Sequence, residues 1–187
     1  MTMKITVFGG ASPKPDDQAY LEAYQLGRLL GDAGHTVLTG GYIGTMEAVS
    51  KGANEAGAHV IGITCDEIEH WRPLKVNRWV QEEIPCRTLN ERLHALIEQC
   101  DAAIALPGGV GTLAEIAMLW NHMVIDAVKK KPLILIGDGW KDTLNQFLQS
   151  QGSYLSIADK LLISFATDIH SIIPMLENNT RSKGLNP

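Results

Sequence analysis

Apolar and polar positions divide the chain into two alternating kinds of segment. Short apolar runs, typical of buried strands, are separated by longer segments in which apolar residues recur every three or four positions, as in amphipathic helices. The predicted strands are Ile5–Phe8, Thr36–Thr39, His59–Thr64, Ala102–Leu106, Leu133–Ile136 and Leu161–Phe165. The predicted helices are Asp17–Ala33, Ile43–Ala56, Leu89–Cys100, Thr112–Val128, Lys141–Gln149 and Asp168–Leu176.

This alternation predicts an α/β fold of the Rossmann-like, doubly wound type, with a mostly parallel sheet and helices on both faces. The run Leu133–Ile136 contains no polar residue, as expected for a parallel strand that is covered on both sides. With 187 residues, we expect a single nucleotide-binding domain over residues 1–177 and a flexible C-terminal tail over 178–187. The charged, tryptophan-bearing segment from Asp66 to Pro85 fits neither pattern, and we interpret it as a lid or a strand-bearing excursion.

Glycine-bearing turns follow the first, second and fourth predicted strands. The carboxyl ends of parallel strands meet at one edge of a sheet, where ligands bind. A helix that begins there leaves backbone N–H groups free to bind phosphate. The residues expected to bind phosphate or nucleotide are Gly10, Ser12, Gly40, Gly41, Gly44, Gly108, Gly109, Val110, Gly111 and Thr112. The alternative is that these glycines only supply positive φ angles and close packing.

Glu115 lies about one helical turn beyond the third glycine turn. A carboxylate beside a bound anion repels it, so catalysis is the leading explanation for its position. The alternative is a capping box over Thr112–Glu115, in which the glutamate accepts from a backbone N–H at the start of its own helix. Thr88–Glu91 carries the same signature, and there we assign Glu91 the capping role.

Two nucleotide-binding alternatives start from the same glycine turn. Neither this turn nor the earlier ones reads GxxxxGK[ST], which argues against an NTPase. Gly109–Ala114 satisfies the dinucleotide fingerprint GxGxx[G/A], and Asp138 after the next predicted strand could bind a ribose hydroxyl. That fingerprint normally opens the first βαβ unit, whereas here several strands precede it. An NAD(P)-linked oxidoreductase is therefore kept only as an alternative.

Composition excludes several other classes of protein. The formal net charge of −5 argues against nucleic-acid binding, which needs a basic surface. Three cysteines and six histidines show no metal-ligand spacing, so we expect reduced thiols and no metal. No apolar stretch approaches the ~20 residues of a membrane span, and the chain opens without a signal-peptide core. We expect a soluble, cytoplasmic protein without membrane partners.

The segment Pro107–Glu115, PGGVGTLAE, resembles the PGGxGTxxE motif of the LOG (Lonely Guy) proteins. These are cytokinin riboside 5′-monophosphate phosphoribohydrolases, long labelled lysine decarboxylases. Val7–Ser12 resembles the family's FxGSS segment, Gly40–Ala48 its GGxxGxM turn, and Glu91-Arg92 the start of its ERK segment. The resemblance therefore covers most of the chain.

This resemblance implies that Arg92 and Glu115 are the catalytic pair and that Gly108–Thr112 is the phosphate loop. It also implies hydrolysis of the N-glycosidic bond of a nucleoside 5′-monophosphate, of AMP or cytokinin-nucleotide type, to free base and ribose 5-phosphate. No cofactor is expected, and the family implies a homodimer. The decarboxylase label is disfavoured because such chemistry usually needs pyridoxal phosphate on a lysine, and no lysine lies in a glycine turn.

Three positions depart from the family pattern. Leu93 stands where the family carries lysine, Thr39 where it begins a glycine run, and Val110 where tyrosine is frequent. Met46–Ser50 resembles a divergent branch that includes molybdenum-cofactor carrier proteins. The alternative function is therefore a non-catalytic carrier or sensor of a phosphorylated ligand, either a nucleotide or the molybdenum cofactor.

Overall fold

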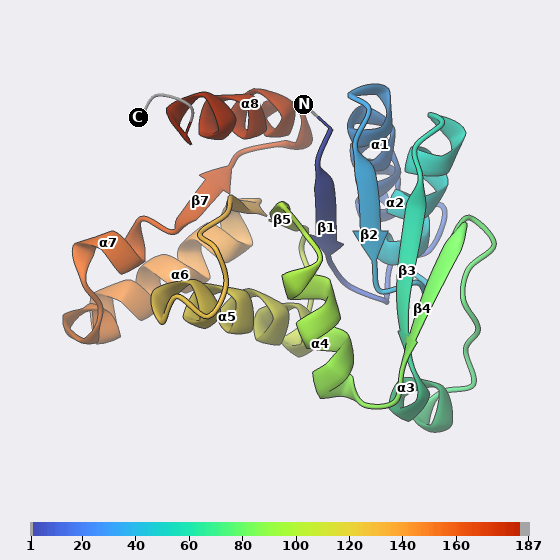
Figure 1. Ribbon diagram of the computed structural model, residues 1–187, viewed down its shortest axis with the longest axis horizontal. Coiled ribbons are helices and arrows are strands. Elements are labelled where there is room, and N and C mark those ends of the chain that lie inside the picture. Colours follow the sequence, from blue (N-terminus) through green and yellow to red (C-terminus); the bar gives the residue numbers. More distant parts are fainter. Residues whose placement is uncertain (1, 184–187) are drawn as a thin grey trace.

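The computed structural model describes residues 2–183, and within them seven strands form one sheet (Figure 1). The strands are β1 (Lys4–Phe8), β2 (Thr36–Thr39), β3 (Val60–Cys65), β4 (Glu82–Cys86), β5 (Ala102–Ala105), β6 (Leu133–Ile136) and β7 (Ile163–Ala166). The α-helices are α1 (Gln18–Asp32), α2 (Thr45–Glu55), α3 (Asp66–Trp71), α4 (Leu89–Glu98), α5 (Val110–Val124), α6 (Asp138–Gln151), α7 (Ile157–Lys160) and α8 (Ile172–Lys183). Two short 3₁₀ turns are η1 (Gly152–Tyr154) and η2 (Ile169–Ser171).

The strand order β4-β3-β2-β1-β5-β6-β7 contains one reversal of direction. The chain builds outward from β1 to β4, then returns to place β5 on the other side of β1 and builds outward again. Every neighbouring pair is parallel, with Ile5 opposite Val37 of β2 and Ala102 of β5. The predicted doubly wound α/β fold is confirmed, and its switch point lies between β1 and β5.

Alternate side chains of each central strand pack into two separate hydrophobic layers. In β1, Ile5 and Val7 pack with α1, α2 and α8, whereas Phe8 packs with α4, α5 and α6. In β6, Ile134 belongs to the first layer and Leu133 to the second. Helices therefore cover both faces, which explains why the strands read as continuous apolar runs.

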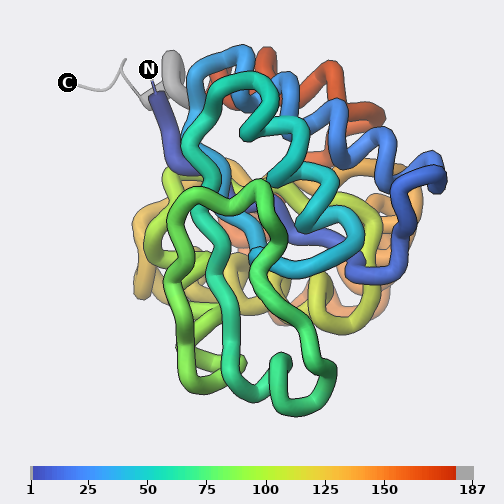
Figure 2. Tube along the Cα trace, turned by 90° about the vertical axis from the view of Figure 1, so that its right-hand side faces the viewer, coloured from blue at the N-terminus to red at the C-terminus, as the bar shows by residue number. Residues whose placement is uncertain are grey.

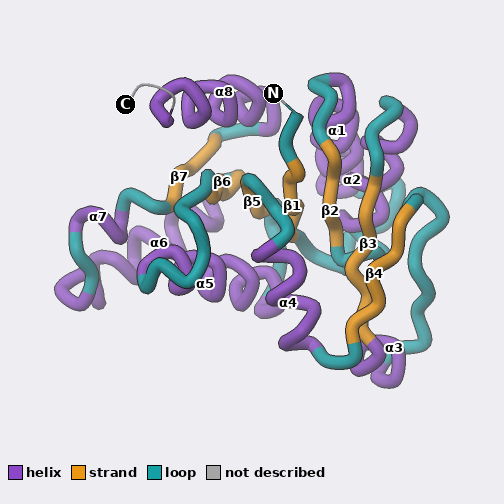
Figure 3. Tube along the Cα trace, in the orientation of Figure 1, coloured by secondary structure: helices purple, strands orange, loops and turns teal. Residues whose placement is uncertain are grey.

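The segment between β3 and β4 projects beyond the carboxyl ends of the strands (Figure 2). It contains the short helix α3 and a long loop, drawn teal in Figure 3, before β4 returns to the sheet. Sequence patterning missed β4 because this edge strand carries two exposed glutamates, Glu82 and Glu83, and an exposed Pro85. The interpretation of this region as a strand-bearing excursion is confirmed.

The six predicted strands are present, but several predicted helix and strand boundaries differ from those in the structure. The helix expected from Thr112 begins at Val110, and the one expected from Lys141 begins at Asp138. The last predicted helix divides into η2 and α8. Of the expected tail 178–187, residues 178–183 continue α8 and 184–187 lie outside the described residues. Across residues 2–183, every helix is too short or too polar to cross a bilayer.

Candidate active site

A cavity of about 410 Å³ lies at the carboxyl edge of the sheet, beside the switch point. Loops after β1, β2 and β5 form its floor, and α3 with the following loop forms one wall. Its lining is more apolar than polar, with two arginines and one carboxylate among the side chains. The lining residues are Gly9, Gly10, Ala11, Ser12, Tyr42, Met46, Ile68, Trp71, Arg72, Leu74, Arg92, Gly109, Val110, Gly111, Thr112 and Glu115.

The start of α5 opens into this cavity. Gly109 is the N-cap residue and supplies no side-chain cap, so the N–H groups of the first turn are available to a ligand. A Cβ atom built on Gly109 or Gly111 would meet nothing within 4 Å, and neither residue has a positive φ. Packing and backbone strain therefore do not explain these two glycines. Gly108 differs, because a Cβ there would collide with the side chain of Thr112.

Two further loops are fixed against the start of α5 by backbone hydrogen bonds. The Gly10 N–H donates to the Pro107 carbonyl at 3.2 Å. The Thr45 N–H and hydroxyl both donate to the Gly10 carbonyl, each at 3.0 Å. The loops after β2, β1 and β5 therefore form one connected surface, as predicted from the meeting of strand ends at one edge.

Arg92 reaches this surface from α4 and is only 5% exposed. Its Nε donates to the Ile63 carbonyl at 2.8 Å, and its Nη2 donates to the Gly40 carbonyl at 3.2 Å. The guanidinium lies over the Tyr42 ring, 5.7 Å from the ring centroid. A side chain on Gly40 would overlap Nη2, so this glycine makes room for the arginine rather than lining the cavity.

Glu115 lies opposite, with its Oε1 3.8 Å from Nη1 of Arg92. The residue is 8% exposed, and burial raises the pKa of its carboxyl to about 7, against the lowering effect of the Arg92 guanidinium. Its side chain forms no hydrogen bond with another described residue. A carboxyl group that titrates near neutrality can exchange protons with a ligand at physiological pH.

The capping-box alternative for Glu115 is wrong. The helix begins at Val110, so Glu115 is its sixth residue and lies too far along the helix to reach the N-cap backbone. For Glu91 the capping role is confirmed, since the Thr88 hydroxyl accepts from the Glu91 N–H and the Glu91 carboxylate accepts from the Thr88 N–H.

The structure gathers most of the predicted site residues around the one cavity. Those that line it are Gly10, Ser12, Arg92, Gly109, Val110, Gly111, Thr112 and Glu115. Gly40 and Gly41 are buried, and Gly108 is exposed but outside the lining of this cavity. Gly44 lines a neighbouring cavity. Gly41 and Gly44 have φ angles of +79° and +73°. At these two positions the alternative given above, that glycine supplies a positive φ angle, accounts for the residue.

Sequence reasoning missed the apolar wall of the cavity, which Ile68, Trp71 and Leu74 provide together with Arg72. The segment's content of tryptophan and charged residues set it apart in the sequence. No motif in it indicated where the segment lies relative to the glycine turns. Trp71 is 81% exposed, an unusual state for the largest side chain. Asp138, the residue on which the dinucleotide alternative depended, does not line the cavity.

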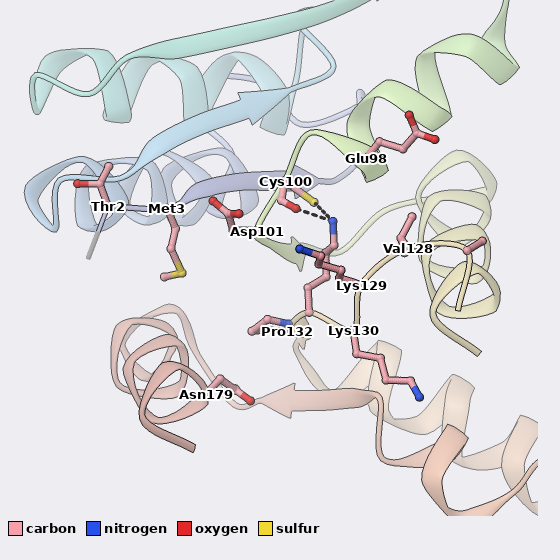
Figure 4. Close-up of a pocket in the computed structure, with 12 residues that line it drawn as sticks. Thr2, Met3, Glu98, Cys100, Asp101, Val128, Lys129, Lys130, Pro132 and Asn179 are labelled. Carbon is pink, nitrogen blue, oxygen red and sulfur yellow. Dashed lines mark hydrogen bonds between the residues drawn. The ribbon is translucent and has the colours of Figure 1, made fainter. Parts of the chain in front are cut away.

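A larger cavity of about 520 Å³ lies at the opposite, amino edge of the sheet (Figure 4). Its Lys131 donates from Nζ to the carbonyls of Ile97 and Cys100, at the end of α4. This ammonium therefore serves as a C-terminal cap for the helix. Among the described residues, no helix begins at this cavity with free N–H groups beside a buried carboxylate, so it lacks the features predicted for the site. Within residues 2–183, no group of His, Cys, Asp and Glu side chains is arranged to hold a metal ion.

The fold and this cavity define a Rossmann-like protein with an uncapped helix start at the switch point of its sheet. A model of the SLOG cluster4 family matches residues 2–161. The chain belongs to this family.

Two rice relatives carry LOG names. One, named cytokinin riboside 5′-monophosphate phosphoribohydrolase LOG, is 31% identical over 93% of this chain and 73% of its own length. The other, named probable cytokinin riboside 5′-monophosphate phosphoribohydrolase LOGL5, is 32% identical over 78% of this chain. Our chain spans only 58% of that relative. The resemblance to the LOG family is confirmed.

A solved structure gives the fold an independent match. It is that of the molybdenum cofactor binding protein from Rippkaea orientalis, with a TM-score of 0.74, 28% identity and coverage of 96% of this chain and 98% of the other. Relatives named as hydrolases and a structural neighbour named as a cofactor-binding protein therefore share this architecture.

Proposed function

We propose that this chain hydrolyses the N-glycosidic bond of a nucleoside 5′-monophosphate, of AMP or cytokinin-nucleotide type. The products are the free base and ribose 5-phosphate. The observation that carries the proposal is Glu115, a buried carboxyl group that caps nothing and lies one turn from the uncapped start of α5. The relatives named phosphoribohydrolases support the same activity.

In this mechanism the 5′-phosphate binds the N–H groups at the start of α5. Anions are favoured there by free donors and by the helix dipole. Gly109 and Gly111 allow close approach because no side chain covers their backbone. Phosphate binding at this position holds the ribose against Glu115, one helical turn further on.

As the C1′–N bond breaks, positive charge develops at C1′ and the ring oxygen. The ionised form of Glu115 stabilises this charge and accepts a proton from the attacking water. The water oxygen then bonds to C1′, and the base leaves with a proton from solvent. A pKa near 7 leaves a substantial fraction of Glu115 ionised at neutral pH.

Arg92 acts on this carboxyl group rather than as a proton donor, because a guanidinium does not release its proton in this pH range. Two of its nitrogens are bonded to the Ile63 and Gly40 carbonyls, which leaves Nη1 directed at Glu115. Its charge favours the ionised carboxylate and opposes the effect of burial. Leu93, where the LOG family carries lysine, is buried outside the cavity lining, so this departure does not remove a charge from the site.

The test is release of free base from a panel of nucleoside 5′-monophosphates, followed by chromatography, with Glu115→Gln as the inactive comparison. We expect base and ribose 5-phosphate in equal amounts from wild type. We expect Glu115→Gln to bind nucleotide without cleaving it. A fully active Glu115→Gln protein would remove the proposed mechanism.

The second candidate function is a carrier or sensor of a phosphorylated ligand, which the match to the Rippkaea orientalis protein supports. It uses the same loops without turnover. Tight binding of a nucleotide or pterin phosphate by wild type, with no base released over hours, would select it. The homodimer, the cytoplasmic location and the absence of a cofactor stay predictions.

A further inference from the structure

The apolar wall of the candidate active site, which Ile68, Trp71 and Leu74 form together with Arg72, takes no part in the proposed bond cleavage. Helix α3 has no buried residue, and Trp71 at its end is 81% exposed. Packing of the core therefore does not explain these apolar side chains. Apolar surface gathered on one wall of a cavity indicates a ligand that covers it.

Hydrogen bonds on both sides of Trp71 fix this wall against the loop after β2. Before Trp71, the Tyr42 hydroxyl donates to Oε1 of Glu69 at 3.1 Å. After it, the Asn77 N–H donates to the Gly41 carbonyl at 2.8 Å. The Asn77 side-chain amide donates to the carbonyls of Gly41 and Tyr42, each at 3.0 Å. The position of the wall is therefore set by the fold.

Tyr42 also contacts the proposed catalytic pair. The Arg92 guanidinium lies over the Tyr42 ring, 5.7 Å from the ring centroid, and Nη1 of Arg92 is 3.8 Å from Oε1 of Glu115. A second link joins α3 to the first residue of α4, the helix that carries Arg92, because the Leu89 N–H donates to Oε2 of Glu67 at 2.8 Å. The wall and the catalytic pair therefore keep a fixed relation across one cavity.

The parts of a nucleotide match different parts of this cavity. In the proposed function the phosphate binds the start of α5 and C1′ lies at Glu115, so the base extends from Glu115 to the remaining surface. Two other apolar lining residues are already placed: Val110 begins α5, and Sδ of Met46 is 3.8 Å from Nη2 of Arg92. The apolar wall is left for the base. Every base has a π-face that can stack on an aromatic side chain.

We propose that Trp71 determines base specificity by stacking on the base of a bound nucleoside 5′-monophosphate, and that the site prefers purines to pyrimidines. The inference rests on the proposed function and names the substrate class of the same site. The fused purine ring has the larger face, so it gains more from stacking. Trp71 binds the leaving base but exchanges no proton with it, so its removal acts on KM and leaves the pH–rate profile in place.

The first experiment measures KM and kcat for AMP, and Ki for CMP as a competitor of AMP, in wild type, Trp71→Ala and Tyr154→Ala. Tyr154 is an aromatic residue of matched exposure, 85%, that does not line this cavity. In wild type, KM for AMP should be about fivefold below Ki for CMP. Trp71→Ala should raise KM for AMP about tenfold and Ki for CMP about threefold, with kcat within about twofold. Tyr154→Ala should change neither constant.

Three results would overturn the proposal. They are equal affinities of wild type for AMP and CMP, an unchanged purine preference in Trp71→Ala, and an equal loss in Tyr154→Ala. The conservative variant Trp71→Phe keeps an aromatic face, so it should hold KM for AMP within about threefold of wild type. A Trp71→Phe protein as impaired as Trp71→Ala would contradict stacking. Circular dichroism of each variant excludes unfolding as the cause.

Calorimetric binding of AMP and ribose 5-phosphate separates failure of this inference from failure of the proposed function. Ribose 5-phosphate lacks the base, so Trp71→Ala should weaken AMP binding about tenfold and leave ribose 5-phosphate within about twofold. If AMP is bound in this pattern but not hydrolysed, the hydrolase proposal fails and the role of Trp71 stands. If AMP is hydrolysed and Trp71→Ala weakens both ligands equally or neither, only the role of Trp71 fails.

Discussion

The starts of α4 and α5 carry the same four-residue signature and use it differently. Thr88–Glu91 reads TLNE, and Thr112–Glu115 reads TLAE. In α4 the threonine is the N-cap and the glutamate closes a capping box. In α5 the helix already begins at Val110, so the same signature falls inside the helix and the glutamate lies in the cavity.

The difference comes from the residues that precede each signature. Three glycines lie just before and within the start of α5, and the N-cap is Gly109. The helix therefore begins before Thr112, whose side chain packs against Gly108. A capping signature therefore indicates a capping box only when its first residue is the N-cap of the helix. In α4 the glutamate accepts a hydrogen bond from the backbone at the start of its own helix. In α5 the first-turn N–H groups and the glutamate remain available to a ligand.

The strongest test of this comparison exchanges one atom in each glutamate. Glu115→Gln should lower kcat for base release on the order of 10³-fold, since it removes the charge that faces the transition state. Glu91→Gln should keep kcat within about twofold, because an amide oxygen can still accept from the backbone. Steady-state kinetics on both variants measures this. Comparable losses in the two would mean that the helix starts are not functionally distinct.

Arg92 belongs to α4 but acts on the glutamate of α5. Arg92→Met should lower kcat/KM about 10²-fold and shift the ionisation of Glu115 to higher pH, since the guanidinium lowers the pKa of that carboxyl. The rising limb of the pH–rate profile should move to higher pH. Arg87→Met removes an exposed arginine just before α4 and is the control. An unshifted limb would show that Arg92 does not set the protonation state of Glu115.

The two glutamates should also differ in the pH dependence of stability. The folded-state pKa of Glu115, about 7, lies above the value of 4.5 for an exposed carboxyl. Its contribution to stability is therefore fully present below pH 4.5 and is lost as pH rises through 7. The expected loss is about 3 kcal/mol of unfolding free energy between pH 4.5 and pH 8. Urea unfolding should show this loss in wild type but not in Glu115→Gln, and Glu91→Gln should follow wild type.

A smaller effect is expected from closing the open surface of the α5 start. Gly111→Ala fills space that is vacant in the structure, so it should stabilise the fold by up to ~1 kcal/mol through helix propensity. Because Gly111 lines the cavity of the proposed active site, the added methyl group should raise the KM for nucleotide about tenfold. Thermal unfolding measures the expected gain in stability, and steady-state kinetics measures the expected loss of nucleotide affinity. A rise in stability with unchanged KM would remove this glycine from the phosphate site.

The smallest effect concerns the cap of α4. Thr88→Ala removes the acceptor for the Glu91 N–H and should cost about 1 kcal/mol of stability. Because Thr88 does not line the cavity, KM should not change. Urea unfolding at one pH, with kinetics below the transition, checks both. A change in KM would mean that the two helix starts are coupled.

The sequence predicted the fold from residues that pack on both sides of the sheet. Continuous apolar runs such as Leu133–Ile136 identify central strands because both faces are covered. The exposed edge strand β4 lacks that signal and was missed. Local motifs also predicted the glycine loops, whose backbone geometry depends on neighbours in the chain.

The environment of Arg92 was not predictable in this way. Its two anchoring carbonyls, on Ile63 and Gly40, lie 29 and 52 residues away in the sequence. Nothing in the local sequence around Arg92, in the first turn of its helix, indicates that its side chain is buried. Only the packing of β2 and β3 beside α4 buries it. The contribution of Trp71 and Arg72 to the cavity likewise depends on where a long loop returns to the sheet.

The hydrogen bonds that orient Arg92 end on neutral, buried carbonyl oxygens rather than on surface carboxylates. Dissolved ions therefore have little to screen in this anchoring, whereas they weaken attraction between a phosphate and an exposed helix end. Raising the ionic strength should consequently weaken nucleotide capture while leaving the turnover rate of captured nucleotide nearly constant.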